Sequence, residues 1–158
     1  MNQLKYILIV ALVMVSSIGF AQKKLILSSG VSYQKQLFGE FSIMLSETAM
    51  NHTGLGIYGP KLGVEMNFKP NDFIYAPKLG FEVSVLFFSV QSSVVGYIEN
   101  GNTDLRLLPE IGFSFFGLAN LTYGYGIPIL NYKVEDVSRH RVALTFNLLR
   151  DLWKDIFK

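Results

Sequence analysis

The stretch RVALTFNL, residues 141–148, alternates between polar or small side chains and large apolar ones. Its large apolar residues occupy every second position: Val142, Leu144, Phe146 and Leu148. Successive side chains of an extended chain point to opposite sides, so these four residues share one face. The stretch therefore predicts a β-strand with one apolar face, and the same pattern recurs upstream.

Residues 61–68 and 80–87 repeat this alternation, with Leu86 as the one exception. Segments rich in Gly, Pro, Asn and Asp separate such runs and indicate turns. The strands that we expect cover residues 25–35, 38–47, 56–68, 73–88, 91–98, 104–116, 119–130 and 139–149. The sequence thus predicts an all-β fold, a single eight-stranded antiparallel up-and-down β-barrel (a meander) over residues 22–149.

A short sequence motif recurs in the expected strands. GPKLGVE (59–65) returns as APKLGFE (76–82), and PEIGF (109–113) is a fainter copy. If Asn71-Asp72 forms a two-residue turn, Glu65 lies opposite Lys78 and Lys61 lies opposite Glu82. The repeat would then create two cross-strand ion pairs that fix the register.

Charged side chains are expected on the polar face of several strands. By alternation they are Glu40, Lys61, Glu65, Lys78, Glu82, Arg106, Glu110 and Arg141. Buried charges are costly unless they are paired, and this set holds four acids and four bases. Because barrels of eight strands fill their interior with side chains, we expect a closed, charge-paired lumen rather than a polar path.

Proline is unusual inside a strand because it has no N–H to donate. Pro60, Pro77 and Pro109 fall within or near the expected strands. We expect strand starts or bulges at Pro60 and Pro77, and a bulge at Pro109.

The two faces favour a membrane barrel over a soluble one. The apolar face carries large residues, whereas many positions on the polar face are Gly, Ser, Thr or Asn, which suit a narrow interior. Half of all residues are hydrophobic, but no run reaches the roughly 18 apolar residues of a spanning helix. Strands of about 9–11 residues suffice for a barrel, so we expect the apolar face to contact lipid.

Residues 1–21 are typical of a secretory signal peptide: Lys5 precedes an apolar run, and small Gly19 and Ala21 precede the expected cleavage site. The absence of cysteine excludes disulfides and a lipoprotein anchor. We expect an outer-membrane location, with the periplasm as the alternative. Residues 150–158 change to helical spacing and predict a short amphipathic tail, the alternative being a frayed end of the last strand.

The sequence offers little chemistry. A net charge of +2 without a basic patch does not indicate nucleic-acid binding. GLGIYG (54–59) matches the dinucleotide-binding glycine pattern, but Pro60 and a strand follow it instead of a helix. His52 and His140 are too far apart in sequence to predict a metal site. We expect no cofactor and no metal.

Ser138-Arg139-His140, with Glu135 or Asp136 nearby, is the one combination that suggests a hydrolytic site. Its spacing and order match no motif, so we expect no catalytic residues. Basic residues near lipid phosphates at the barrel rim are the simpler interpretation. A lipid-modifying enzyme similar to lipid A deacylases remains the alternative.

Several stretches resemble secreted β-barrel proteins of flavobacteria-like Gram-negative bacteria. They are FAQ (20–22), YAPKLGFEVS (75–84), LRLLPEIGFSFFG (105–117), TYGYGIPI (122–129) and SRHRVALTFNL (138–148). The resemblance implies an outer-membrane barrel but no activity. The chain departs from many such barrels because a tail follows the last strand, where a terminal aromatic residue is usual.

Together these features predict a small, non-catalytic outer-membrane barrel with a structural or adhesion role. Its expected partners are membrane lipid and, during biogenesis, the outer-membrane assembly machinery. A periplasmic lipocalin-like binder of an apolar ligand is a further alternative. It would require Phe81, Val83, Phe113 and Phe115 to line the lumen.

Overall fold

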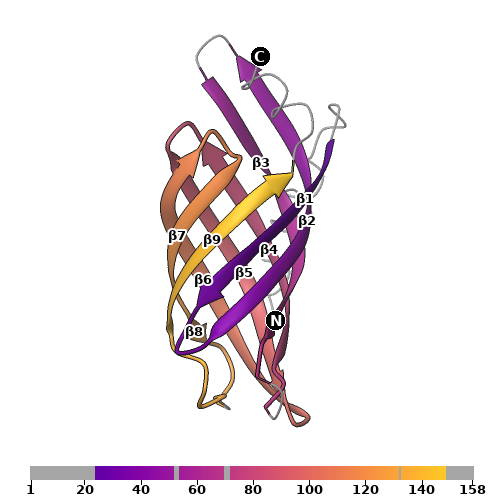
Figure 1. Cartoon of the computed structure of the whole chain (residues 1–158), viewed down its shortest axis with the longest axis vertical. Helices are drawn as coiled ribbons and strands as arrows, with labels where there is room; N and C mark the ends of the chain where they lie inside the picture. Colours follow the sequence, from indigo (N-terminus) through magenta and orange to yellow (C-terminus); the bar gives the residue numbers. More distant parts are fainter. Residues whose placement is uncertain (1–23, 52–53, 70–71, 132, 149–158) are drawn as a thin grey trace, which may run out of the picture.

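The computed structural model describes residues 24–51, 54–69, 72–131 and 133–148. Their strands are β1 (Lys24–Tyr33), β2 (Leu37–Asn51), β3 (Gly54–Asn67), β4 (Tyr75–Val85), β5 (Phe88–Glu99), β6 (Asn102–Phe115), β7 (Ala119–Tyr125), β8 (Ile127–Pro128) and β9 (His140–Leu148). Each strand from β1 to β7 pairs antiparallel with the next, β8 pairs with β6, and β9 closes the barrel by pairing with both β7 and β1 (Figure 1). The predicted all-β fold is confirmed: a closed eight-stranded up-and-down barrel with one extra short strand, β8.

The two ends of the barrel differ. At the terminus end, where β1 begins and β9 ends, the β2–β3 hairpin extends beyond the other strands (Figure 1). Its outer part pairs Glu47–Asn51 with Gly54–Tyr58, past the first pair between β1 and β2, Lys24 with Ser46. The opposite end, called the loop end, carries the longest connection, residues 129–139. The predicted signal peptide (residues 1–21), His52 and the predicted tail (residues 150–158) lie outside the described residues.

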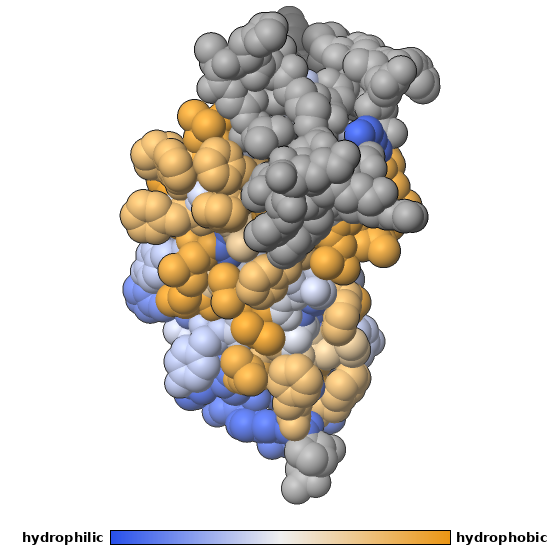
Figure 2. All heavy atoms as spheres, turned by 45° about the horizontal axis from the view of Figure 1, so that its top comes forward, coloured by the Kyte–Doolittle hydropathy of each residue, from blue (hydrophilic) through white to orange (hydrophobic). Residues whose placement is uncertain are grey.

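Apolar side chains cover the outside of the barrel, and most of the buried side chains inside it are polar or charged. In β9, Arg141, Ala143, Thr145 and Asn147 are buried while the residues between them are exposed. Figure 2 shows hydrophobic atoms over much of the described surface, with hydrophilic atoms gathered toward the loop end. The lipocalin-like arrangement is wrong, because Phe81, Val83, Phe113 and Phe115 all point outward. None of the described residues belongs to a helix that is long and apolar enough to cross a membrane.

The interior contains two apolar clusters. At the terminus end the cluster consists of Ile26, Met44, Ile57 and Leu118. At the loop end it consists of Phe38, Ile74, Ala76, Val95, Tyr97, Leu108, Val134 and Val137. The last two side chains come from the 129–139 loop, which therefore folds inward and fills that end of the barrel. Polar and charged residues occupy the space between the clusters.

Each of the three prolines interrupts one ladder and leaves the other intact. The β2–β3 pairing skips two pairs at Pro60, the β4–β5 pairing skips two at Pro77, and the pairing of β6 with β7 and β8 skips two at Pro109. A missing N–H donor explains each gap. The register is the same on both sides of every gap, so the expected bulges are wrong. The gap at Pro109 is what divides the predicted strand 119–130 into β7 and β8.

The turn between β3 and β4 is longer than predicted. Asn67 organises it: its backbone N–H donates to Ile74 O (3.1 Å), and its Oδ1 accepts the N–H of Ile74 (2.9 Å). The last pair of the ladder is Met66 with Tyr75. The predicted two-residue turn at Asn71-Asp72 and its register are therefore wrong by two residues. A shift of two residues keeps every side chain on its predicted face.

The predicted strand 73–88 is also too long. β4 ends at Val85, and Leu86 adopts a positive φ of 52° in the tight turn to β5. Leu86 is the residue that broke the alternation in the sequence, so that exception marks the turn.

Candidate functional site

Seven charged side chains meet in the middle of the barrel. They are Glu40, Lys61, Glu65, Lys78, Glu82, Glu110 and Arg141, here called the charged layer, and each is at most 4% exposed. They come from strands β2, β3, β4, β6 and β9. Each lies on the inward side because the alternation places it there.

Arg141 is the centre of the charged layer. Its Nη2 lies 2.6 Å from Glu40 Oε2 and 2.8 Å from Glu65 Oε1, and its Nη1 lies 2.5 Å from Glu110 Oε1. One guanidinium therefore joins three carboxylates from three different strands, which its forked, planar donor geometry permits.

The two lysines complete the layer. Lys61 Nζ lies 3.1 Å from Glu82 Oε2 and 3.4 Å from Glu40 Oε1. Lys78 Nζ lies 3.2 Å from Glu110 Oε2, 3.4 Å from Glu40 Oε2 and 3.5 Å from Glu65 Oε1. The structure thus brings together Lys61 with Glu82 and Lys78 with Glu65, as the repeat predicted. These partners meet diagonally rather than as directly opposed residues.

Glycine is the usual cross-strand neighbour of the charged layer. The opposed pairs are Gly30–Glu40, Gly80–Lys61, Gly63–Lys78, Gly59–Glu82, Gly124–Glu110 and Gly124–Arg141. A glycine has no side chain, so the long side chain opposite can lie across it in the narrow interior. At Gly80, an added Cβ would lie 2.5 Å from Ser92 O and 2.5 Å from Ser93 Cβ. The small residues of the polar face therefore provide room for the charges.

Neutral donors add hydrogen bonds to the layer, which holds four carboxylates and three cations. Glu82 Oε1 accepts hydrogen bonds from Ser84 Oγ (2.9 Å) and Asn120 Nδ2 (2.7 Å). Gln34 Nε2 donates to Glu65 Oε2 (3.2 Å), and Thr122 Oγ1 donates to Glu110 Oε1 (3.2 Å). Amide and hydroxyl dipoles thus help to stabilise the one negative charge by which the carboxylates outnumber the cations.

The space beside the charged layer is very small. A cavity of about 10 Å³ borders Lys61, Lys78 and Gly80. That volume holds a single water at most. This part of the barrel is a packed interior, and its arrangement favours a structural role for the charges.

Arg106, the eighth predicted interior charge, lies apart from the other seven. It is buried nearer the loop end, where its Nη2 lies 2.5 Å from Asp104 Oδ2. Asp104 was not among the predicted interior charges, although it lies two residues before Arg106 on β6 and therefore on the same face. Arg106 also donates to the backbone oxygens of Val137 (3.1 Å) and Ser138 (2.7 Å), and so holds the 129–139 loop in the barrel.

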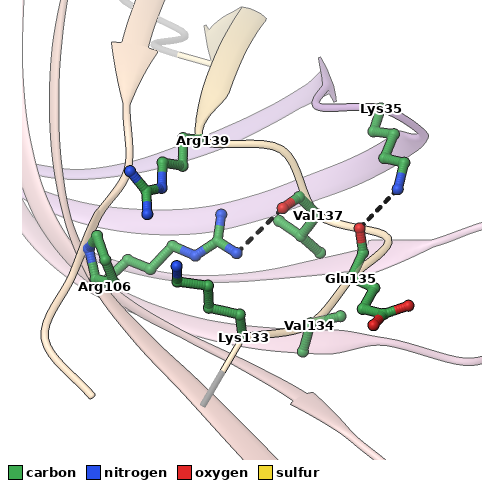
Figure 3. Close-up of a pocket in the computed structure, with 8 residues that line it drawn as sticks. Lys35, Arg106, Lys133, Val134, Glu135, Val137 and Arg139 are labelled. Atoms are coloured by element: carbon green, nitrogen blue, oxygen red, sulfur yellow. Dashed lines mark hydrogen bonds between the residues drawn. The ribbon is translucent and has the colours of Figure 1, made fainter. Parts of the chain in front are cut away.

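A basic pocket opens where this loop meets the barrel (Figure 3). Its volume is about 480 Å³, and its charged lining residues are Lys35, Arg106, Lys133, Glu135 and Arg139, here called the basic mouth. In Figure 3 the charged ends of Arg106, Lys133 and Arg139 lie toward one another. Lys35 and Lys133 were not predicted as site residues, because turn and loop residues follow no alternation.

The Ser138–His140 combination does not form a nucleophile–base pair. Ser138 Oγ accepts a hydrogen bond from the backbone N–H of His140 (3.0 Å), and the ring Nδ1 of His140 lies 2.6 Å from Tyr123 Oη. Asp136 contacts Lys69 (3.0 Å) and Lys35 (3.7 Å) instead of the histidine. The ring of His140 is therefore oriented toward the outer tyrosines of β7.

Within the described ranges, no group of three or more His, Asp or Glu side chains could hold a metal ion. Comparison with protein-family models, with curated proteins and with solved structures finds no match to this chain.

Proposed function

We propose that the chain is a small outer-membrane β-barrel that serves as a structural or adhesion component and carries out no reaction. The observation that carries the proposal is the inverted arrangement of its side chains: apolar outside and charged inside. A protein that folds in water buries its apolar face, because that burial is the main favourable contribution to folding. Here the exposed apolar residues come from every long strand of the barrel.

The outer face is too apolar to remain in water. Phe113 is 70% exposed, and large hydrophobic residues of β1, β4, β6 and β9 continue the same surface around the barrel. Soluble monomers rarely expose contiguous apolar patches of more than a few hundred Å². A closed barrel also pairs its backbone groups between strands, which hydrocarbon surroundings require. Lipid chains are therefore the partner that this surface fits.

Because side chains fill the interior of the barrel, we propose that the protein acts through its outer surface and its exposed ends. The charged layer and the two apolar clusters occupy the lumen of the described barrel, so transport through it is not proposed. We propose that the outer-membrane assembly machinery inserts the chain, and that its exposed ends contact other molecules.

The test is to express the full chain in a Gram-negative host, separate soluble and outer-membrane fractions, and run the protein on a gel with and without boiling. Recovery in the outer-membrane fraction, with faster migration before boiling, is the expected result. Recovery as a soluble periplasmic protein would refute the proposal.

A further inference from the structure

We propose that the basic mouth binds the headgroup phosphate of a lipid whose hydrocarbon chains lie along the outer face of β1 and β9. This inference rests on the proposed membrane location and adds a site and a ligand class to it. The barrel would then hold one lipid in a defined place, in addition to the lipids that surround it.

The first observation is uncompensated positive charge. The pocket is lined by four cationic side chains and one acidic one. Lys133 has no ion pair or hydrogen bond with any described residue, and the contact of the Arg139 side chain is with a neutral group, Tyr125 Oη, at 3.4 Å. These two residues contrast with Lys35, which already contacts Glu135 O (2.7 Å) and Asp136.

The second observation is a buried donor at the pocket. Arg106 is 3% exposed and has five N–H groups. Its hydrogen bonds to Asp104, Val137 and Ser138 use one N–H of Nη1 and leave the other without a partner among the described residues. Gly126 lies directly beside this side chain: a Cβ there would lie 3.1 Å from Arg106 Cδ and 3.6 Å from its Nη1, so the missing side chain leaves the guanidinium uncovered on that side. A phosphate oxygen in the pocket would satisfy this donor.

The third observation is a neighbouring hollow that leads to the apolar surface. It has a volume of about 530 Å³ and shares Lys35 and Glu135 with the basic mouth. Its walls include Tyr33 and Val142, which are 61% and 48% exposed on the outer face. A cationic pocket that continues into an apolar hollow fits a molecule with an anionic head and hydrocarbon chains.

Aromatic side chains mark the same rim as an interfacial region. The rings of Tyr125 and His140 pack edge to face with centroids 5.2 Å apart, and Tyr123 is hydrogen-bonded to His140. Tyrosine side chains are enriched where lipid headgroups meet hydrocarbon. Arginine and lysine beside them bind phosphate through charge-assisted hydrogen bonds. The rim therefore places the pocket at the depth of lipid phosphates.

Native mass spectrometry of the detergent-solubilised full chain tests the proposal. The probes are phosphatidic acid, the diacylglycerol with the same chains, and inorganic phosphate. The test variant is Lys133→Gln with Arg139→Gln. The matched control is Lys24→Gln with Lys158→Gln, which removes the same charge at positions outside the basic mouth. The gel-mobility assay is run on every variant.

We expect the wild-type chain and the control to bind phosphatidic acid roughly tenfold more than diacylglycerol, and the test variant to lose that preference. Inorganic phosphate at the same concentration should not displace the lipid. A preference that the test variant retains would overturn the proposal, and so would displacement by inorganic phosphate, which would indicate a soluble ligand. Loss of lipid preference in a chain that still shows the mobility shift refutes this site alone. Absence of the shift in the wild type refutes the membrane barrel itself.

Discussion

The charged layer and the basic mouth contain the same kinds of side chain in opposite circumstances. In the layer, Lys61, Lys78 and Arg141 each lie within 3.5 Å of two or three carboxylates and are almost fully buried. In the mouth, Lys133 and Arg139 are exposed and contact no carboxylate among the described residues.

This difference indicates how charged residues that support the fold of a barrel can be distinguished from those that are available to bind a ligand. Most residues of the charged layer have a glycine directly opposite, so the fold makes room for each side chain and its partners. The basic residues of the mouth come largely from turns and border open space. Charges of the first kind stabilise the fold, and those of the second kind are available to a ligand.

The strongest test of this contrast compares two arginines near the start of β9. Arg141→Met leaves the three buried carboxylates around it with Lys78 as their one remaining shared cation and should destabilise the folded barrel by about 3–5 kcal/mol. Arg139→Met removes the same charge from the mouth and should change stability by less than about 0.5 kcal/mol. Urea unfolding in lipid vesicles measures both. Equal effects of the two substitutions would contradict the distinction.

The next test concerns the glycines. Gly80→Ala places a Cβ against Ser92 O and Ser93, opposite Lys61, and should cost about 1–3 kcal/mol through crowding. Gly96→Ala is the control, because its nearest neighbour would be Leu105 Cδ1 at 3.6 Å, an ordinary contact. The same unfolding assay applies. If both alanines are tolerated alike, glycine is not needed to make room for the charged layer.

A smaller effect is expected when the coupling energy of one buried ion pair of the charged layer is compared with that of one exposed ion pair at the loop end. A double-mutant cycle with Lys61→Met and Glu82→Gln should give a coupling energy of about 1–3 kcal/mol, because the pair is buried. Lys35 and Asp136, whose side chains are 58% and 38% exposed, should couple more weakly, because water screens an exposed pair. Unfolding of the four variants in each cycle gives both values. A larger coupling for the exposed pair would reverse the expected order.

The smallest effect is a pH dependence at the loop end. The hydrogen bond from Lys69, and the charges of Lys69 and Lys35, hold the pKa of Asp136 below its ordinary value. A lowered folded pKa contributes stability above the unfolded pKa of about 3.9 and loses it as pH falls through the lower folded value. Between pH 5 and about pH 2, the Tm of the wild type should therefore fall slightly more than that of Asp136→Asn. Parallel curves would show that Asp136 contributes nothing.

Alternation in the sequence was enough to predict the closed barrel, because period-2 patterning reports which face each side chain occupies. Alternation also places Asp104 on the inner face, because it lies two residues before Arg106 on β6. The register of β3 with β4 could not be predicted from alternation, because hydrogen bonds between Asn67 and Ile74 set the length of the turn that joins these strands. The basic mouth could not be predicted from the sequence pattern either, because Lys35 and Lys133 come together only when the 129–139 loop folds into the end of the barrel.

The repeat shared by β3 and β4 has a consequence for folding kinetics. The native register places Lys61 opposite Gly80, whereas a register two residues away places it opposite Glu82 on the same face. An isolated hairpin can therefore form either pairing, and the second has opposed charges in its favour. We expect a minor population of chains to refold slowly, since strands paired in this way must separate before the barrel closes. Weakening the Asn67 turn should enlarge that population, so the repetition that supplies the charges of the interior also creates a kinetic trap.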